Sequence, residues 1–236
     1  MKVIGIVGHM GAGKTTIANE LIRKNFVRQS LEFSSIIKQL SKIFFEAGYL
    51  RDVGSIRDAV LERFIKQKIG QKVREVCKEV FGHEDVFIDC LFSRIVGDVV
   101  ISDIRMKREA ERILSLDGKL YRSNNLVGYL IYLDAPEHIR RARIEKRQNG
   151  EIYTDNEWQK IHQHSTEMEI EEIVNLFGTN NRFLKIDATK NIDTIVMEIA
   201  NFASLKQLSD EQRIKEYLIN KYGLEPELSE AQKSWH

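Results

Sequence analysis

The sequence contains few cysteines and prolines, two of each among 236 residues. Cys77 and Cys90 lie in segments with helical patterns and lack the C-x-x-C spacing of zinc and redox sites, so we expect two ordinary reduced thiols. No apolar run approaches the roughly 20 residues of a membrane-spanning helix. The apolar stretch at residues 3–7 is too short for the core of a signal peptide. These absences predict a cytoplasmic protein that does not contact a membrane.

An excess of one charge is also lacking. Lys and Arg total 36 while Asp and Glu total 35, so no global positive field exists that would hold nucleic acid. Any site for an anion must therefore be built locally. Charged residues make up 30% and hydrophobic residues 42% of the chain, which is typical of a folded, helix-rich protein rather than a disordered one.

Short apolar runs alternate with longer segments of helical periodicity. The runs are typical of strands buried on both faces of a parallel sheet, and they occupy residues 3–7, 99–101, 129–133 and 183–186. The helical patterns occupy residues 107–116, 137–148 and 191–202. This alternation predicts an α/β fold with a parallel sheet, helices on both faces and ligands at the carboxyl ends of the strands.

The same patterns predict how the chain is organised. We expect a domain over residues 1–203 and a C-terminal helical extension over residues 204–236. Residues 34–95 carry helical patterns almost throughout and predict an insertion suited to a second substrate. A lid is expected at about residues 137–165, and the capping-box spacing of Thr154 and Glu157 predicts a helix that ends near residue 176. No feature of the sequence indicates an oligomeric state.

Residues 8–15 read GHMGAGKT and match the phosphate-loop motif G-x-x-x-x-G-K-[ST] in full, between an expected strand and an expected helix. Glycines let the backbone curl so that successive N–H groups face a phosphate, and the helix N-terminus adds partial positive charge. We expect Lys14 to bridge the β- and γ-phosphates of ATP and the Thr15 hydroxyl to bind Mg²⁺. The alternative, a chance glycine-rich turn, is rare in this context. The expected ATP-binding residues are Gly8, Gly11, Ala12, Gly13, Lys14, Thr15 and Thr16.

The remaining motifs indicate what happens to the γ-phosphate. The chain has no Asn-Lys-x-Asp guanine signature. Asp103, which follows the apolar run at residues 99–101, is the candidate acid that holds Mg²⁺ beside Thr15; a turn residue at a strand end is the alternative. Arg105 is expected at the same edge, where a fixed cation would face a second anionic group.

Arginines also follow Asp134-Ala135-Pro136. Arg140, Arg143 and Arg147 share one face of an expected helix, an arrangement that repels itself unless anions occupy it. Such a helix is suited to close over the phosphoryl group, with Arg143 and Arg147 as catalytic cations and Arg140 beside the acceptor. The alternative is a solvated basic face balanced by Glu137 and Glu145.

Ser34 and Arg74 are the acceptor-site candidates within the helical insertion. Arg74 lies in a helix with several lysines, so an exposed basic face is the alternative. An alcohol acceptor usually needs a carboxylate to take its proton, whereas a monophosphate arrives ionised and needs cations. Arginines at three separate places therefore favour a phosphorylated acceptor. The loop after Asp187 is a candidate for the adenine edge, and Trp158 is expected to be a packing residue.

These residues together resemble the nucleoside-monophosphate-kinase-like P-loop families. The phage-type deoxynucleoside monophosphate kinases and a related archaeal nucleotide-kinase-like family are the most similar, and the resemblance covers about residues 1–202. Animal-type phosphomevalonate kinases share the Ser-Asp-x-Arg element at residues 102–105. The spacing of Asp134, Pro136, Arg143 and Arg147 is also similar to that of dephospho-CoA kinases.

The resemblance implies a core sheet, a helical substrate-binding region, an arginine lid, a Mg²⁺-ATP donor and a phosphate-bearing acceptor held at Arg74 and Arg105. The chain departs from these families at residues 123–128 and after Ala203. Our leading hypothesis is transfer of the ATP γ-phosphate to a nucleoside or deoxynucleoside monophosphate. The alternatives are another small-molecule kinase, such as dephospho-CoA kinase, and a nucleotide-gated ATPase that acts on a protein partner.

Overall fold

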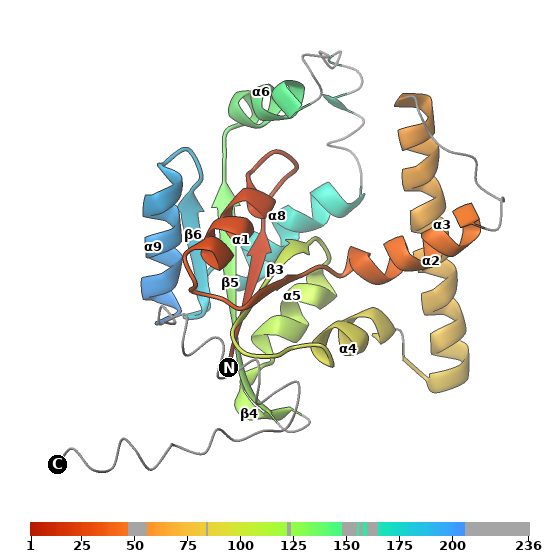
Figure 1. The fold of residues 1–236 in the computed structure, drawn as a ribbon, viewed down its shortest axis with the longest axis horizontal. Helices are drawn as coiled ribbons and strands as arrows, with labels where there is room; N and C mark the ends of the chain where they lie inside the picture. Colours follow the sequence, from red (N-terminus) through yellow and green to blue (C-terminus); the bar gives the residue numbers. More distant parts are fainter. Residues whose placement is uncertain are drawn as a thin grey trace, which may run out of the picture.

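A computed structural model describes residues 1–46, 56–83, 85–121, 124–147, 155, 158–159 and 165–205. Within this part of the chain, six strands form one sheet, and helices cover both of its faces (Figure 1). One face carries α1 (Lys14–Arg23) and α9 (Ile192–Phe202). The other face carries α4 (Val86–Phe92), α5 (Lys107–Leu114) and α8 (Ser165–Phe177). The predicted α/β fold is confirmed.

The sheet is parallel in all but one of its described pairings. Its strands are β1 (Lys2–Val7), β2 (Gln29–Leu31), β3 (Val99–Ile104), β4 (Asp117–Tyr121), β5 (Asn124–Asp134) and β6 (Phe183–Asp187). The order is β2-β3-β1-β5-β4, and β6 also pairs with β5. The β4–β5 pair is antiparallel and the other pairs are parallel. The segments after β1, β3, β5 and β6 therefore share one edge of the sheet.

The central strand β1 supplies side chains to two hydrophobic cores. Val3 and Val7 pack beneath α5 and α8, whereas Ile4 and Ile6 pack beneath α1 and α9. All four side chains are fully buried. Burial on both faces explains why the apolar run at residues 3–7 is nearly continuous rather than alternating. The phosphate loop thus leaves the most deeply buried part of the sheet.

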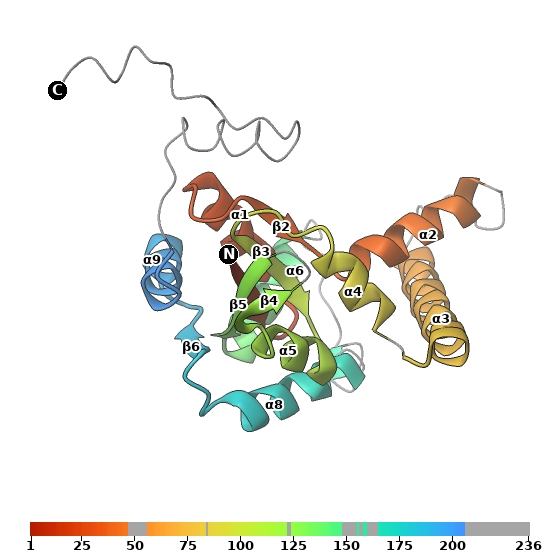
Figure 2. The same cartoon turned by 90° about the horizontal axis from the view of Figure 1, so that it is seen from below.

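Helices α2 (Ser34–Glu46) and α3 (Ile56–Phe81) form an arm that projects from the side of the sheet (Figure 2). They approach each other at Gly70, where an added Cβ would lie 2.9 Å from Ile37 Cδ1. Helix α4 then returns the chain to the sheet, and its Ile88 and Leu91 side chains enter the core. The helical patterns predicted within residues 34–95 are therefore present as α2, α3 and α4.

Several boundaries differ from the sequence predictions. Strand β3 runs to Ile104, so Asp103 lies within the strand rather than after it. Strand β5 begins at Asn124 and pairs with β4, so residues 124–128 belong to a β-hairpin. The hairpin lies at the opposite end of the sheet from α6 (Glu137–Arg147) (Figure 1). The short strand β2 has too little apolar character to be predicted.

Other predictions meet the structure only in part. Helix α8 ends at Phe177, close to the expected end, but Thr154 and Glu157 lie outside the described residues. Most of the expected C-terminal extension, from residue 206 onward, also lies outside them. Cys77 and Cys90 are both free thiols. Among the helices that the structure describes, none is both long and apolar enough to cross a membrane.

Candidate active site

The loop at residues 8–13 joins the carboxyl end of β1 to the N-terminus of α1, as predicted. Gly11 and Gly13 have φ angles of 85° and 100°, in the left-handed region that residues with side chains rarely adopt. Gly11 also lies against the main chain of α6, where an added Cβ would be 2.6 Å from the Arg140 carbonyl oxygen. Position 11 therefore requires glycine for both its conformation and its packing.

Main-chain N–H groups of this loop are available to a ligand. Ala12 N–H donates to His9 O at 3.1 Å and Ile17 N–H to Gly13 O at 3.0 Å, which closes the turn and starts the helix. Among the described residues, the N–H groups of Gly11, Gly13, Lys14, Thr15 and Thr16 find no acceptor. A group of such donors at a helix N-terminus suits an anion, and phosphate in particular.

The Lys14 ammonium group lies beside this row of donors. Its Nζ atom donates to the carbonyl oxygens of Gly8 and His9, at 3.1 Å for His9. Burial, followed by the charge of Arg105, lowers the pKa of Lys14 to about 8, while the carboxylates of Glu167 and Asp103 act in the opposite direction. An anion bound at the loop would favour the charged ammonium form.

Asp103 holds the root of the helical arm. The N–H groups of Phe33 and Ser34 donate to its two carboxylate oxygens, each at 2.9 Å. Burial raises the pKa of Asp103, and these hydrogen bonds oppose the shift. Thus the predicted strand-end acid also fixes the start of α2.

The predicted magnesium ligands can be tested against this geometry. Each oxygen of the Asp103 carboxylate retains a lone pair after accepting one hydrogen bond, and Thr15 is exposed at the start of α1. Among the described residues, no group of three or more His, Cys, Asp or Glu side chains could hold a metal. This fits Mg²⁺, which is usually bound by one or two protein oxygens, water and substrate phosphates. The assignment to Thr15 and Asp103 stays a prediction.

Arg105 follows β3 in a turn that Glu109 fixes. The N–H groups of Arg105 and Met106 donate to Glu109 Oε2 at 2.9 and 3.0 Å, and this capping box starts α5. Burial raises the pKa of Glu109 to about 7. Within the described part of the chain, the Arg105 guanidinium makes no hydrogen bond or ion pair. The charge of Arg105 contributes to the lowered pKa of Lys14, and both residues lie at the same edge of the sheet, after β3 and β1.

Arg140 is buried against the phosphate loop instead of facing solvent. Its side chain is 6% exposed, and its Nε donates to Ala135 O at 3.1 Å. One of its terminal nitrogens makes a longer contact of 3.5 Å with Met10 O. The guanidinium also lies 5.9 Å from the centre of the Trp158 ring, and that buried tryptophan donates to Glu137 at 2.6 Å. Trp158 is therefore a packing residue, as predicted.

Arg143 bridges two loops at the edge of the sheet. It donates to Ala12 O at 3.2 Å and to Ala188 O at 2.8 Å. Ala188 begins the segment after Asp187, which is the predicted adenine edge. Main-chain carbonyls thus offset the charge that the arginine face was expected to direct at an anion. The side chain of Arg147, the third residue of that face, lies outside the described residues.

The two acceptor candidates in the helical insertion lie at different places. Ser34 begins α2, where its N–H is bound to Asp103 and its hydroxyl lies 3.4 Å from Glu32 Oε2. Arg74 lies on α3, with its guanidinium 5.8 Å from the centre of the Phe87 ring. Asp103 therefore brings Ser34 to the strand edge that also carries Arg105. Among the described residues, no hydrogen bond or ion pair joins Arg74 to this group.

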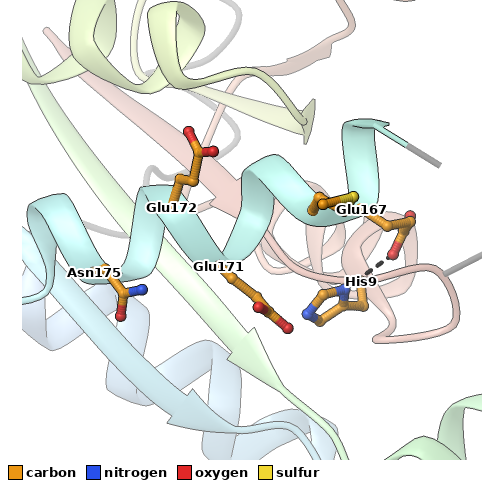
Figure 3. Close-up of a pocket in the computed structure, with 6 residues that line it drawn as sticks. His9, Glu167, Glu171, Glu172 and Asn175 are labelled. Atoms are coloured by element: carbon orange, nitrogen blue, oxygen red, sulfur yellow. Dashed lines mark hydrogen bonds and ion pairs between the residues drawn. The ribbon is translucent and has the colours of Figure 1, made fainter. Parts of the chain in front are cut away.

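Sequence reasoning did not identify a contact between His9, in the phosphate loop, and Glu167, on α8 (Figure 3). Glu167, on α8, is 3% exposed; its Oε2 lies 3.0 Å from His9 Nδ1 and accepts from Met10 N–H at 3.2 Å. Burial raises the pKa of Glu167, but hydrogen bonds from His9 and Met10 and the Lys14 charge outweigh it, giving about 2. His9 and Glu167 are 158 positions apart, so no local pattern reveals the pair.

Comparisons with known proteins identify a family and several structures to which the chain is similar. Residues 4–172, most of the chain, match a family model described as an AAA domain. A structure of deoxyadenosine kinase from M. mycoides, with dCMP and dCDP bound, is 17% identical with a TM-score of 0.41, covering 85% of this chain and 97% of that chain. Shikimate kinase from Aquifex aeolicus is 13% identical with a TM-score of 0.44, covering 86% and 96%. No curated protein sequence matches the chain.

The buried Glu109 carboxyl generates a prediction about stability. The pKa of Glu109 rises from 4.5 to about 7 on folding, so the folded protein keeps a proton that the unfolded chain has already lost. The stability that this protonated group contributes is complete below about pH 4.5 and is lost as pH rises through about 7, by roughly 3 kcal/mol. Glu109→Gln keeps an acceptor oxygen for both N–H groups, so we expect it to abolish this loss.

Chemical denaturation at about pH 4 and about pH 8 measures the effect. The variant should gain stability relative to the wild type as pH rises. Glu111→Gln, at an exposed position of the same helix, serves as the control and should follow the wild type. A constant difference between wild type and Glu109→Gln at the two pH values would contradict the prediction.

Proposed function

The chain belongs to the AAA-domain family, and we propose that it is a magnesium-dependent phosphotransferase that moves the γ-phosphate of ATP to a phosphorylated small molecule. We propose a nucleoside or deoxynucleoside monophosphate as the acceptor. One observation carries the proposal: the loop presents N–H groups without an acceptor among the described residues, and two cations that follow different strands, Lys14 after β1 and Arg105 after β3, lie at the same edge of the sheet. The two cations and the loop N–H groups together could offset the negative charge of two phosphate groups rather than one.

The donor half of the site is the loop at residues 8–16. Its N–H groups would bind the β-phosphate, and Lys14 would leave the carbonyl oxygens of Gly8 and His9 to reach the β- and γ-phosphates. We assign Arg143 to the nucleotide, between its phosphates and its base, because this side chain joins the phosphate loop to Ala188. Mg²⁺, held by Thr15 and Asp103, would neutralise phosphate oxygens.

The acceptor half is proposed at Arg105, Ser34 and Arg74, on the side of the helical arm. A phosphate acceptor is already ionised and needs no base, but it must approach a second anion. Arg105 suits this task because Glu109 fixes its main chain while its guanidinium keeps its donors for a ligand. Asp103, whose oxygens hold the start of α2, would act as an anchor and metal ligand rather than as a base.

A panel of acceptors tests the proposal directly. ATP and Mg²⁺ are incubated with each nucleoside and deoxynucleoside monophosphate, with dephospho-CoA and with phosphomevalonate, and ADP formation is followed together with the phosphorylated product. We expect turnover with at least one monophosphate and none with the matching unphosphorylated nucleoside. Turnover with a non-nucleotide acceptor alone would reject the nucleotide assignment. Hydrolysis that only a protein partner stimulates would favour the nucleotide-gated ATPase, which the family description also allows.

Lys14→Ala is expected to remove most of the turnover, by about a hundredfold or more, because Lys14 is the cation assigned to the β- and γ-phosphates. The fold should persist, since Lys14 contacts loop carbonyls rather than either hydrophobic core. Steady-state rates and thermal unfolding measure both outcomes. Arg23→Ala is the matched control, since this exposed cation of the same helix pairs only with Glu20 among the described residues. Unchanged turnover in Lys14→Ala would contradict the site.

Arg105→Ala is expected to raise the KM for the phosphorylated acceptor at least tenfold and to leave the affinity for Mg²⁺-ATP within about threefold. The reason is that the lost guanidinium faces the acceptor rather than the row of loop N–H groups. Initial rates with each substrate varied in turn separate the two effects. Arg94→Ala, at an exposed position before β3, is the control. A larger effect on ATP than on the acceptor would move Arg105 to the donor half.

A further inference from the structure

One residue of the phosphate loop, Met10, is held from two sides. Its N–H donates to Glu167 Oε2 on α8 at 3.2 Å, and its carbonyl oxygen lies 3.5 Å from a terminal nitrogen of Arg140 on α6. The peptide groups on either side of Met10 are thus fixed by elements far from the loop in sequence. Helices α6 and α8 are also the two described helices that flank residues 148–164.

The Glu167 contact is the stronger of the two. The carboxylate is 3% exposed and binds one loop N–H and one loop side chain through the same oxygen, Oε2. Hydrogen bonds to a charged, buried group are worth more than bonds between neutral groups. Because the pKa of Glu167 is lowered to about 2, this carboxylate is charged near neutral pH. The first half of the loop is therefore held by an anion of the protein itself.

The N–H groups of the loop up to Met10 and those from Gly11 onward differ in what they bind. Glu167 binds the N–H of Met10, whereas the N–H groups of Gly11 and of residues 13–16 find no acceptor in the described part of the chain. Met10 and Gly11 are the two central residues of the turn that Ala12 N–H and His9 O close, so the N–H that Glu167 binds is adjacent in sequence to the first of these donors. Glu167 thus binds outside the row of donors proposed for phosphate, and does not block it.

The surroundings of Glu167 do not indicate a separate ligand site. It lines a hollow of about 240 Å³ together with His9, Met168, Glu171, Glu172 and Asn175 (Figure 3). The acidic side chains here form no group that could hold a metal among the described residues. In Figure 3 the Glu167 carboxylate turns away from Glu172 and toward His9 and the loop. The contacts of this carboxylate with His9 and Met10 therefore indicate its function.

We propose that Glu167 is a positioning residue that holds the first half of the phosphate loop, through Met10 and His9, in the conformation that presents its remaining N–H groups to ATP. The inference rests on the proposed phosphate-binding function of the loop, but not on the identity of the acceptor. A loop that is already ordered loses less conformational entropy when the nucleotide binds. Removing the carboxylate therefore weakens Mg²⁺-ATP binding even though the residue never touches the nucleotide.

Three variants separate positioning from general stability. Glu167→Ala removes the acceptor and should weaken Mg²⁺-ATP binding about tenfold by calorimetry. Glu167→Gln keeps an oxygen that can accept from Met10 N–H, so it should recover most of the affinity. Glu171→Ala, on an exposed position of the same helix beside the same hollow, is the control and should bind as the wild type does. Acceptor KM values should be unchanged in all three.

Amide hydrogen exchange gives a second readout that needs no variant to fold. In the nucleotide-free wild type, the Met10 amide should exchange at least tenfold more slowly than the Gly13 amide, which has no acceptor in the described chain. Equal exchange of these two amides would overturn the inference, as would wild-type affinity in folded Glu167→Ala. A wild-type protein that binds no Mg²⁺-ATP would instead refute the proposed function.

Discussion

The site follows from a row of main-chain N–H groups that find no acceptor within the described part of the chain. Such groups are unfavourable in a buried place, and a fold keeps them only where the chain is held by other contacts. Here the loop between β1 and α1 is held by two left-handed glycines, by the Ala12–His9 turn and by contacts from α6 and α8. The deeply buried β1 strand anchors its other end.

The same region gathers more positive charge than its carboxylates balance. The charges of Arg105 and Arg140 lower the pKa of Lys14, and the carboxylates of Glu167 and Asp103 act in the opposite direction. The remaining compensation comes from main-chain carbonyl oxygens, which accept from Lys14, Arg140 and Arg143. Carbonyl groups offset a cation less well than a phosphate does, so the arrangement favours an incoming anion. Of the arginines of α6, Arg140 and Arg143 donate to main-chain carbonyl oxygens around the loop instead of facing solvent.

How much of this could be predicted depends on the range of the interactions involved. The β1 strand, the loop and α1 follow from a continuous local pattern, and α6 and α9 follow from helical periodicity. By contrast, β4 exists because it pairs with the start of β5, and nothing in residues 117–121 alone requires a strand. Asp103 was recognised as a site residue, but its bonds to Phe33 and Ser34 depend on how β2 and β3 align. The contacts of Glu167 with the loop could not be predicted either, because they join residues that are far apart in the sequence.

Gly11 shows how two independent requirements can meet at one position. Its φ of 85° disfavours any side chain, and the main chain of α6 would collide with one. Gly82 also has a positive φ, of 78°, but has open space around it, so an asparagine there would meet only the first obstacle. Glycine should therefore be kept more strictly at position 11 than at position 82 among homologues, because a side chain at position 11 would also require α6 to move away from the loop.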